Sequence, residues 1–244
     1  MRIVTLNTWK NEGRYDHRLA LMAEGLAALA PDVVCLQEAF QAQGRDTAAR
    51  LGEALGLYVS IEPARRKARL HEGRPMDSAS GLAILSRAAP QARGRIALPV
   101  DPADGERIAQ WIQATPDLRI LNLHLTHLRG SEASALRGRQ LAHAMAEAAS
   151  PGSRLLAVGD FNAPATAPEL AAVAAGLDPA APPTLQGERA GRPISPAGAA
   201  IDHAILVETG RWRLVSRFNA LDRPDADGFF PSDHAAVVAD LARA

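Results

Sequence analysis

The chain reads RLLAVGDFN at residues 154–162, an apolar run that ends abruptly in polar side chains. Arg154 to Val158 is predicted to form a buried strand, because short apolar runs bounded by turn residues are typical of strands inside a core. Asp160 and Asn162 follow two residues apart, and so lie on the same side of an extended segment. Side chains at such a strand end leave the core and can enter a cleft. We therefore expect a functional cleft at this end of the strand.

Polar strand ends of this kind recur along the chain. Acidic, amide or imidazole residues close other apolar runs at Leu6-Asn7-Thr8-Trp9, Leu36-Gln37-Glu38, Asn122-Leu123-His124-Leu125, Ile201-Asp202-His203 and Ser232-Asp233-His234. Taken singly, each such residue is more often a turn former or a helix cap than a catalyst. His203 and His127 are interpreted as surface or half-buried histidines, whereas His17, His71 and His143 have no acidic partner nearby in sequence. Only the joint pattern indicates a function.

Strand-like and helix-like runs alternate in both halves of the chain. Apolar residues at helical spacing predict a helix at 19–29, and further helices are predicted at 48–55, 131–149 and 167–175. Strands are predicted at 2–7, 33–36, 57–62, 81–85, 93–98, 107–114, 119–125, 154–158, 200–207 and 212–217, with a last strand or helical turn at 235–241. This alternation predicts an α/β (α+β) fold in which two packed sheets lie between outer helices, a four-layer arrangement.

Length and loop composition favour one domain that covers residues 1–244. A chain of 244 residues with 47% apolar residues can bury a substantial core. The segment from Pro179 to Pro196 holds five prolines, and we interpret it as a long loop rather than a linker, because the remainder is too short to fold alone. Loops of this length often line a functional site.

The overall charge is balanced, with 27 basic and 27 acidic residues. Proteins that grip long nucleic acid usually carry an excess of basic residues, so net charge does not favour nucleic acid as a partner. The single cysteine, Cys35, lies in an apolar run and excludes an intramolecular disulfide. No run approaches the ~20 apolar residues that cross a bilayer, and Met1 to Leu6 looks like a strand rather than a signal peptide. We expect a cytoplasmic monomer without a transmembrane segment.

In their order, the strand-end motifs resemble the endonuclease/exonuclease/phosphatase superfamily, which includes deoxyribonucleases, abasic-site endonucleases, neutral sphingomyelinases and inositol polyphosphate phosphatases. The most specific motifs are GDFN at 159–162 and SDH at 232–234, supported by LQE at 36–38 and by SGLAILS at 80–86, which looks like the family's central strand. The resemblance covers nearly the whole chain. It implies a four-layer αββα sandwich of two mixed β-sheets and a metal-dependent hydrolase that cleaves a phosphodiester or phosphomonoester by in-line attack of an activated water.

The resemblance also implies a metal site and a water-activating residue. Glu38 matches the main metal ligand, Asn7 matches its amide partner, and Asp233 matches a residue that assists the metal directly or through water. Mg²⁺ or Mn²⁺ is the expected cofactor, because hard divalent cations prefer oxygen ligands. Asp160 matches the residue that orients or deprotonates the attacking water, and Asn162 matches the amide that contacts the phosphate.

Two histidines complete the expected catalytic set. His234 matches the family's essential histidine and Asp202 its partner carboxylate, which favours the protonated imidazole that can stabilise the negative transition state. His124 matches the second histidine, which contacts phosphate or assists the leaving group. Glu62 either orients His124, as in the deoxyribonuclease branch, or is a solvated glutamate before Pro63.

The sequence leaves the substrate open. Trp9 stands where some nuclease branches carry an additional acidic ligand, and it either packs beneath the site or meets an apolar part of the substrate. Arg65-Arg66-Lys67-Ala68-Arg69 and Arg74 form either a phosphate-binding lip or a solvated basic loop. A small or lipid-linked phosphoester is favoured, with a DNA or RNA endo- or exonuclease as the alternative. A third hypothesis is an inactive phosphate-binding module. The presence of every expected site residue argues against it.

Overall fold

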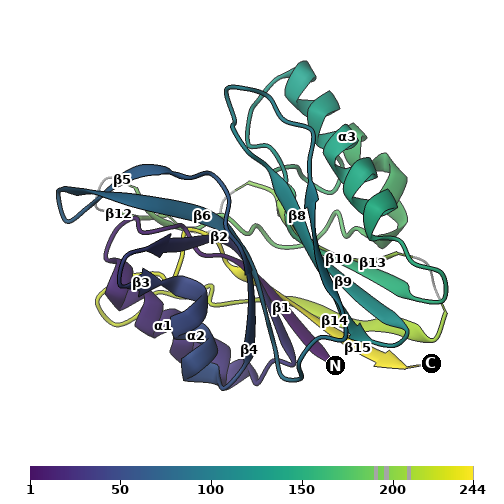
Figure 1. Ribbon diagram of the computed structural model, residues 1–244, viewed down its shortest axis with the longest axis horizontal. Helices are drawn as coiled ribbons and strands as arrows, with labels where there is room; N and C mark the ends of the chain where they lie inside the picture. The colour runs from purple at the N-terminus through teal and green to yellow at the C-terminus, as the bar shows by residue number, and fades with distance from the viewer. Residues whose placement is uncertain (190–191, 195–197, 208–209, 244) are drawn as a thin grey trace.

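The computed structural model describes residues 1–189, 192–194, 198–207 and 210–243, and it contains two mixed β-sheets with helices on their outer faces (Figure 1). The first sheet consists of β1 (Arg2–Asn7), β2 (Val33–Ala42), β3 (Arg45–Asp46), β4 (Tyr58–Glu62), β5 (Lys67–His71), β6 (Arg74–Ser86), β14 (Trp212–Ala220) and β15 (Ala236–Arg243). The second consists of β7 (Arg93–Ala97), β8 (Ile108–Thr115), β9 (Leu118–His124), β10 (Arg154–Asp160) and β13 (Asp202–Val207). The remaining elements are the short pair β11 (Gly187–Arg189) and β12 (Arg192–Ile194), the α-helices α1 (Tyr15–Leu29), α2 (Thr47–Leu55) and α3 (Ser131–Ala148), and the 3₁₀ helix η1 (Pro168–Gly176).

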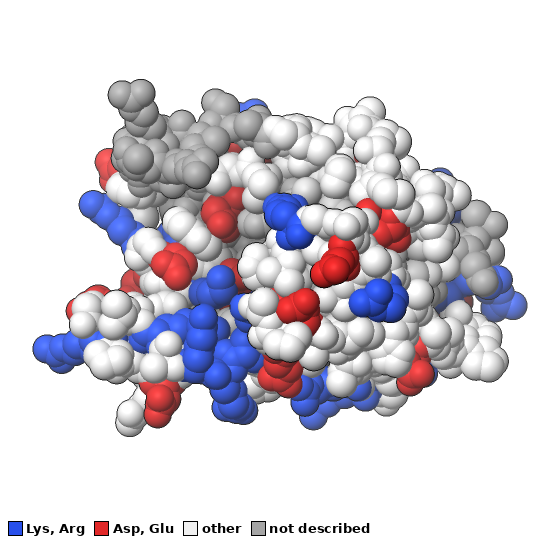
Figure 2. Space-filling model, turned by 90° about the horizontal axis from the view of Figure 1, so that it is seen from above, with Lys and Arg blue, Asp and Glu red and all other residues white. Residues whose placement is uncertain are grey.

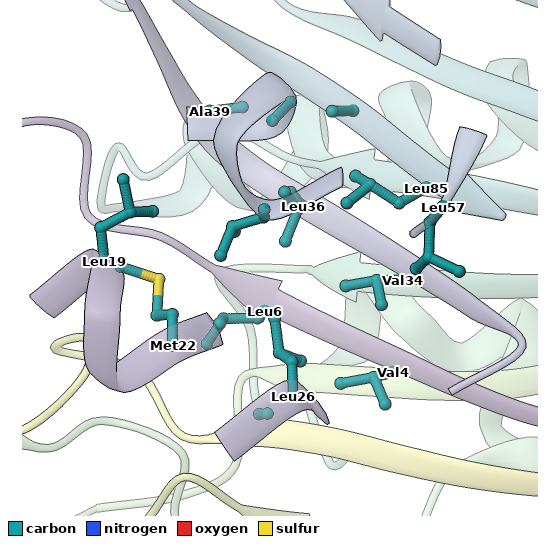
Figure 3. Packing of buried hydrophobic residues seen from close by; sticks show 14 of the residues in the cluster. Val4, Leu6, Leu19, Met22, Leu26, Val34, Leu36, Ala39, Leu57 and Leu85 are labelled. Atoms are coloured by element: carbon teal, nitrogen blue, oxygen red, sulfur yellow. The ribbon is translucent and has the colours of Figure 1, made fainter. Parts of the chain in front are cut away.

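Helices α1 and α2 cover the outer face of the first sheet, whose main strand order is β14-β15-β1-β2-β6-β4. Figure 3 shows Leu6 and Leu36 of the sheet directed toward Met22 of α1, in a cluster of fully buried apolar side chains. Helix α2 begins after Asp46, whose carboxylate accepts a hydrogen bond from the Ala49 amide at 2.8 Å. The cap thus sets where α2 begins, and burial of apolar side chains holds the helices against the sheet.

The second sheet has the order β13-β10-β9-β8-β7, and α3 and η1 cover its outer face. Leu123 and Ala157 of this sheet share a buried cluster with Leu141 of α3 and Leu170 of η1. A third cluster lies between the two sheets and contains Ile3, Cys35, Ile84, Ile120 and Val158. The order helix, sheet, sheet, helix confirms the predicted four-layer αββα sandwich. Cys35 is fully buried in its centre, and burial raises the pKa of its thiol.

Strand β2 is longer than the sequence predicts. It does not end near Glu38 but continues to Ala42, and its pairing with β6 shifts register between Leu36 and Ala39. Glu38 has a φ angle of 54°, in the left-handed region. This bulge interrupts the alternation of side chains, and so redirects the Glu38 side chain within a strand that goes on beyond it.

The basic segment after residue 65 forms a hairpin rather than a loop. Lys67–His71 pairs antiparallel with the first part of β6, which begins at Arg74 instead of residue 81. Glu72 and Gly73 connect the two strands with φ angles of 50° and 75°, the pattern of a two-residue hairpin turn. Three of the basic side chains, Arg66, Lys67 and Arg74, are exposed on this hairpin, and Arg69 is buried.

Three other predictions are refined. The helix expected at 167–175 is a 3₁₀ helix, and the last apolar run is a strand, β15. The loop expected between Pro179 and Pro196 contains β11 and β12, whereas its residues 190–191 and 195–196 lie outside the described part of the chain. Among the described helices, none combines the length and apolar character needed to span a bilayer.

Candidate active site

A polar cavity of about 270 Å³ lies where the strand ends of both sheets meet. Seven of the residues predicted from sequence line it, namely Asn7, Glu38, His124, Asp160, Asn162, Asp233 and His234. Its other lining residues are Trp9, Lys10, Arg65, Arg107 and His127. Residues separated by more than 200 positions in sequence thus contribute to one cavity, in which carboxylate, amide, imidazole and cationic groups face one another.

Strand register in the second sheet places three of these groups side by side. Asp160 ends β10, where it is the parallel partner of His124 on β9 and the antiparallel partner of Asp202 on β13. The Nε2 atom of His124 is 3.6 Å from Asp160 Oδ2. Gly159, which precedes Asp160, has a φ angle of 137°, and a side chain there would collide with the Leu123 carbonyl. The close approach of β9 and β10 therefore requires glycine before the carboxylate.

His234 and Asp202 form a buried pair. The Nδ1 atom of His234 is 2.8 Å from Asp202 Oδ2, which leaves Nε2 directed toward Asp160 at 4.0 Å from its Oδ2. Burial alone would lower the pKa of His234, but the charge and hydrogen bond of Asp202, together with Asp160 and Asp233, raise it to about 10. The imidazole is therefore held protonated at neutral pH.

Thr184 connects the backbone at Asp202 with the backbone next to His234. Its hydroxyl accepts a hydrogen bond from the Asp202 amide at 3.3 Å, and its carbonyl accepts one from the Ala235 amide at 2.7 Å. Thr184 comes from the proline-rich segment that sequence analysis interpreted as a loop lining a site. The segment contributes mainly by joining the start of β13 to the residues beside His234.

Asp160 is held by two neighbours. The Asn7 side-chain amide donates to its Oδ2 at 3.0 Å, and the Asn162 backbone amide donates to its Oδ1 at 2.8 Å. Burial, followed by the nearby charge of Asp202, raises the pKa of the Asp160 carboxyl, although His234 opposes this. A carboxyl with a raised pKa is better matched to accepting a proton near neutral pH.

His124 differs from His234 in charge. Burial, with the nearby cations Arg107 and Lys10, holds its pKa well below the usual range, so its imidazole is neutral. Glu62, the predicted partner of His124, does not line the cavity, and no hydrogen bond joins the two among the described contacts. The orienting role of Glu62 therefore stays a prediction without a contact that supports it.

Oxygen atoms of a kind that divalent cations bind also line the cavity. Glu38 and Asp233 offer carboxylates, and the Asn7 Oδ1 atom accepts only the Trp9 amide, at 3.1 Å, among described contacts. Burial raises the pKa of Asp233 to about 6, and the charge of Glu38 adds to this, although the charges of His234, Arg18 and Lys10 oppose it. One cation is already present, since the Lys10 ammonium lies 3.0 Å from Glu38 Oε1.

A second arrangement could also hold an ion. Asp160, Asp202 and His234 each offer one ligand atom, and these atoms lie within 4.8 Å of one another. In the present geometry the His234 Nδ1 atom is engaged with Asp202, so this group is already joined by hydrogen bonding. The site thus contains the oxygen-bearing side chains of Glu38, Asp233 and Asn7 along the cavity and one buried Asp-Asp-His group.

Sequence reasoning did not identify Lys10, Arg107 and His127 as site residues. Lys10 follows Asn7 by three residues in the turn after β1, which is a signal that could have been used. Arg107 and His127 contact the buried Asp104, a pairing that depends on tertiary structure. Trp9 is half-buried and lines both this cavity and a neighbouring one of about 350 Å³ that also contains Phe229 and Phe230.

Comparison of the sequence with protein families agrees with this geometry. The model of the Endonuclease/Exonuclease/phosphatase family matches residues 4–234. The chain belongs to this family. Membership in the Endonuclease/Exonuclease/phosphatase family confirms the resemblance that the strand-end motifs indicate. The chain therefore has the hydrolase fold of this family, and it contains a buried Asp-Asp-His group. Comparison with curated proteins gives no sequence match.

Solved structures share this fold at low sequence identity. A protein of this family from Beutenbergia cavernae has a TM-score of 0.76 and 23% identity over 100% of this chain and 71% of its own. A mannosyl-6-phosphatase from Bacteroides thetaiotaomicron has a TM-score of 0.72 and 18% identity over 99% of both chains. The human Nocturnin catalytic domain has a TM-score of 0.68 and 18% identity over 100% of this chain and 94% of its own.

Proposed function

We propose that the protein, acting as one domain over residues 1–244, is a metal-dependent phosphoesterase in which Asp160 activates the attacking water and His234 stabilises the transition state. The observation that carries this proposal is the buried chain of contacts from Asp202 through His234 to Asp160. His234 and Asp160 line the same cavity as the Glu38 carboxylate. Each group needed for in-line hydrolysis has a candidate in that cavity.

Asp160 and His234 divide the proton and charge chemistry. The carboxylate of Asp160, with its raised pKa, accepts a proton from the attacking water. His234 keeps its proton through the contact with Asp202, and its Nε2–H can donate to a phosphoryl oxygen as negative charge develops. Asn162 would contact the phosphate beside these two residues. His124, neutral and 3.6 Å from Asp160, lies close enough to contact the phosphoryl or leaving oxygen.

Glu38, Asn7 and Asp233 would hold Mg²⁺ or Mn²⁺. Such an ion, when bound, neutralises charge on the phosphoryl oxygens and lowers the barrier to attack. The oxygen-rich donor set suits either ion. We assign the ion to these residues rather than to the Asp-Asp-His group. Ligation through His234 Nδ1 would break its hydrogen bond with Asp202, and ligation through Nε2 would remove the proton that the raised pKa of His234 retains there.

A small or lipid-linked phosphoester is the substrate class we favour. The cavity is of small-molecule size, and the zero net charge does not favour a long polyanion. Among the fold neighbours, the mannosyl-6-phosphatase is named for a small phosphate ester. The exposed Arg66 and Arg74, at the β5–β6 hairpin, favour the second candidate, a nuclease, because they could contact a nucleic-acid backbone outside the cavity.

A panel of phosphoesters with Mn²⁺, Mg²⁺ or chelator tests this proposal. It should contain bis(4-nitrophenyl) phosphate, 4-nitrophenyl phosphate, a sugar phosphate, sphingomyelin, RNA, and plasmid and single-stranded DNA. We expect turnover of small or lipid esters that chelator abolishes. Nicking of plasmid would establish the nuclease instead, and binding without turnover of any ester would establish the inactive module. Turnover that persists in chelator would contradict the metal-dependent mechanism.

A further inference from the structure

A small cavity lies beside the buried Asp202–His234 pair, on the side of Asp202. Its volume is about 20 Å³, which is room for one water molecule. It lies between β13 and β14, the strands at one edge of the second and of the first sheet, and Asp202 and Arg217 both line it. Among the described residues, none lines both this cavity and the catalytic one. The small cavity is therefore a separate feature that touches the site only through Asp202.

Asp202 has one carboxylate oxygen without a partner. Its Oδ2 atom is 2.8 Å from His234 Nδ1, and its backbone amide donates to the Thr184 hydroxyl. Its Oδ1 atom is buried and has no hydrogen-bond partner among the described residues. A buried charged oxygen is costly without a hydrogen bond, and such atoms in proteins are usually satisfied by a protein group or by an ordered water. We therefore expect a donor at Asp202 Oδ1.

Arg217 offers a donor that also lacks a partner. Figure 2 shows Lys and Arg side chains gathered on one part of the surface, but Arg217 is largely buried, with 16% of its side chain exposed. It reaches from β14 to the second layer, where Nη1 donates to the carbonyls of Ala204 at 3.0 Å and Gly176 at 3.1 Å. The Nε atom is buried and has no hydrogen-bond partner in the described part of the chain. Arg217 thus brings an unused N–H to the cavity that Asp202 lines.

The other charged or titratable residues of the cavity do not replace this donor. His203 uses its Nε2 atom in a contact of 2.9 Å with the Ala163 carbonyl. Burial lowers the pKa of His203, although this contact and the charge of Asp202 oppose the change, so the imidazole is neutral at pH 7. Asp178 lies 3.5 Å from Arg217 Nη2 and is 46% exposed, so solvent screens that ion pair. Arg217 is the cation of this cavity, and Asp202 is its buried carboxylate.

We propose that one buried water molecule in this cavity accepts a hydrogen bond from Arg217 Nε and donates one to Asp202 Oδ1, which makes Arg217 a positioning residue for the Asp202–His234 pair. The water satisfies both unpaired atoms and fixes the plane of the Asp202 carboxylate. Asp202 Oδ2 can then hold the His234 imidazole in the orientation that directs Nε2 toward the phosphate. The positioning role rests on the proposed function, because it requires that His234 act on the substrate, whereas the water site does not.

A high-resolution crystal structure of the metal-free protein tests the water site. We expect an ordered water within hydrogen-bond distance of both Asp202 Oδ1 and Arg217 Nε, and its loss in crystals of Arg217→Lys. The lysine keeps a cation that can donate to the Ala204 and Gly176 carbonyls, but it has no donor at the position of Nε. A cavity without water density, or a direct hydrogen bond between Arg217 and Asp202, would overturn the bridge. This result does not depend on turnover.

Steady-state kinetics on the best ester of the panel test the positioning role. We expect Arg217→Lys to lower kcat about tenfold and to change KM by less than about twofold, because the substrate keeps its own contacts while the orientation of His234 is lost. Arg213→Met is the control on the same strand, at an exposed position, and should keep normal kcat. Circular dichroism and melting temperature establish that both variants are folded. Normal kcat in Arg217→Lys would overturn the positioning role.

A double-mutant cycle with Asp202→Asn separates positioning from a general effect on the fold. If Arg217 acts through Asp202, Arg217→Lys should lower kcat about tenfold in the natural protein but less than about twofold in the Asp202→Asn background. An equal loss in both backgrounds would mean that Arg217 acts elsewhere, and would overturn its positioning role. If no phosphoester is hydrolysed, the proposed function is wrong and the positioning role falls with it, whereas the crystal structure still decides whether the water is bound.

Discussion

The ammonium group of Lys10 lies 3.0 Å from Glu38 Oε1, so a lysine neutralises the residue proposed as the main metal ligand. Both side chains are largely buried, with exposed fractions of 27% and 14%, which limits screening by solvent. The pairing joins the turn after β1 to the bulge in β2, two parallel neighbours in the first sheet. A divalent cation at Glu38 would have to share this carboxylate with Lys10 or displace it.

Lys10→Met is therefore expected to bind Mn²⁺ more tightly than the natural protein, by roughly three- to tenfold, because a competing positive charge is removed. Titration of metal-free protein with Mn²⁺, followed by calorimetry, measures this directly. Lys67→Met is the matched control, since Lys67 is the other lysine of the chain and is exposed on β5. Glu38→Gln should have the opposite effect. Unchanged affinity in both Lys10→Met and Glu38→Gln would place the metal elsewhere.

His234→Ala and Asp160→Asn should each reduce kcat on the best ester of the panel by about 10²- to 10⁴-fold, because each removes a group that acts in the transition state. The measurement is steady-state kinetics at saturating Mn²⁺. His143→Ala and Asp227→Asn, both at exposed positions, are controls that should retain normal turnover. Turnover near that of the natural protein in either site variant would remove that residue from the mechanism.

The candidate site could be predicted residue by residue because its side chains stand at strand ends, where the apolar pattern stops. The strand-end pattern marks Asp160, Asn162 and His234 as candidates, and the family resemblance supplies the role expected of each. Their mutual arrangement depends on register, since Asp160 meets His124 and Asp202 only because β10 pairs with both β9 and β13. Nothing local to any one strand encodes those pairings, so the contacts could not be read from the sequence without the family resemblance.

Bulges and long-range ion pairs explain where sequence reasoning was wrong. At Gln37-Glu38 the apolar pattern stops, which looks like a strand end, yet the backbone makes a bulge and β2 continues. The basic run from Arg65 looks like a solvated loop because its charges show no apolar face. Its pairing with β6 is signalled locally only by Gly73 in a two-residue turn. Arg65 and Arg107 converge through Asp104, which the chain order does not reveal.

Asp202→Asn should lower the pKa of His234. In the natural protein this pKa is raised to about 10 from a usual value near 6.5, so the stabilising contact is fully present below pH 6.5 and is lost as pH rises through about 10. The amide cannot supply the negative charge, and burial then favours the neutral imidazole. NMR titration of the His234 ring in metal-free protein is the measurement. A His234 pKa that stays near 10 in the variant would show that Asp202 is not its cause.

Gly159→Ala tests the approach of β9 and β10 that brings Asp160 beside His124. The added methyl group would collide with the Leu123 carbonyl, a backbone atom that can move only if the sheet shifts, and the φ angle of 137° strains any other residue. We expect a loss of about 3 kcal/mol or more in unfolding free energy, measured by urea denaturation. Turnover of the folded fraction should also fall, because the same shift separates Asp160 from its neighbours.

Gly152→Ala separates backbone strain from the collision. Gly152 also has a positive φ angle, 80°, but nothing lies within 4 Å of the position that its side chain would occupy. We expect this variant to lose only about 1 kcal/mol, the usual cost of the left-handed conformation, and to keep normal turnover. If the two substitutions lowered the unfolding free energy equally, the collision with the Leu123 carbonyl would contribute nothing to the destabilisation by Gly159→Ala. The placement of Asp160 would then depend on the pairing of β10 with β13 and on its hydrogen bonds to Asn7 and Asn162.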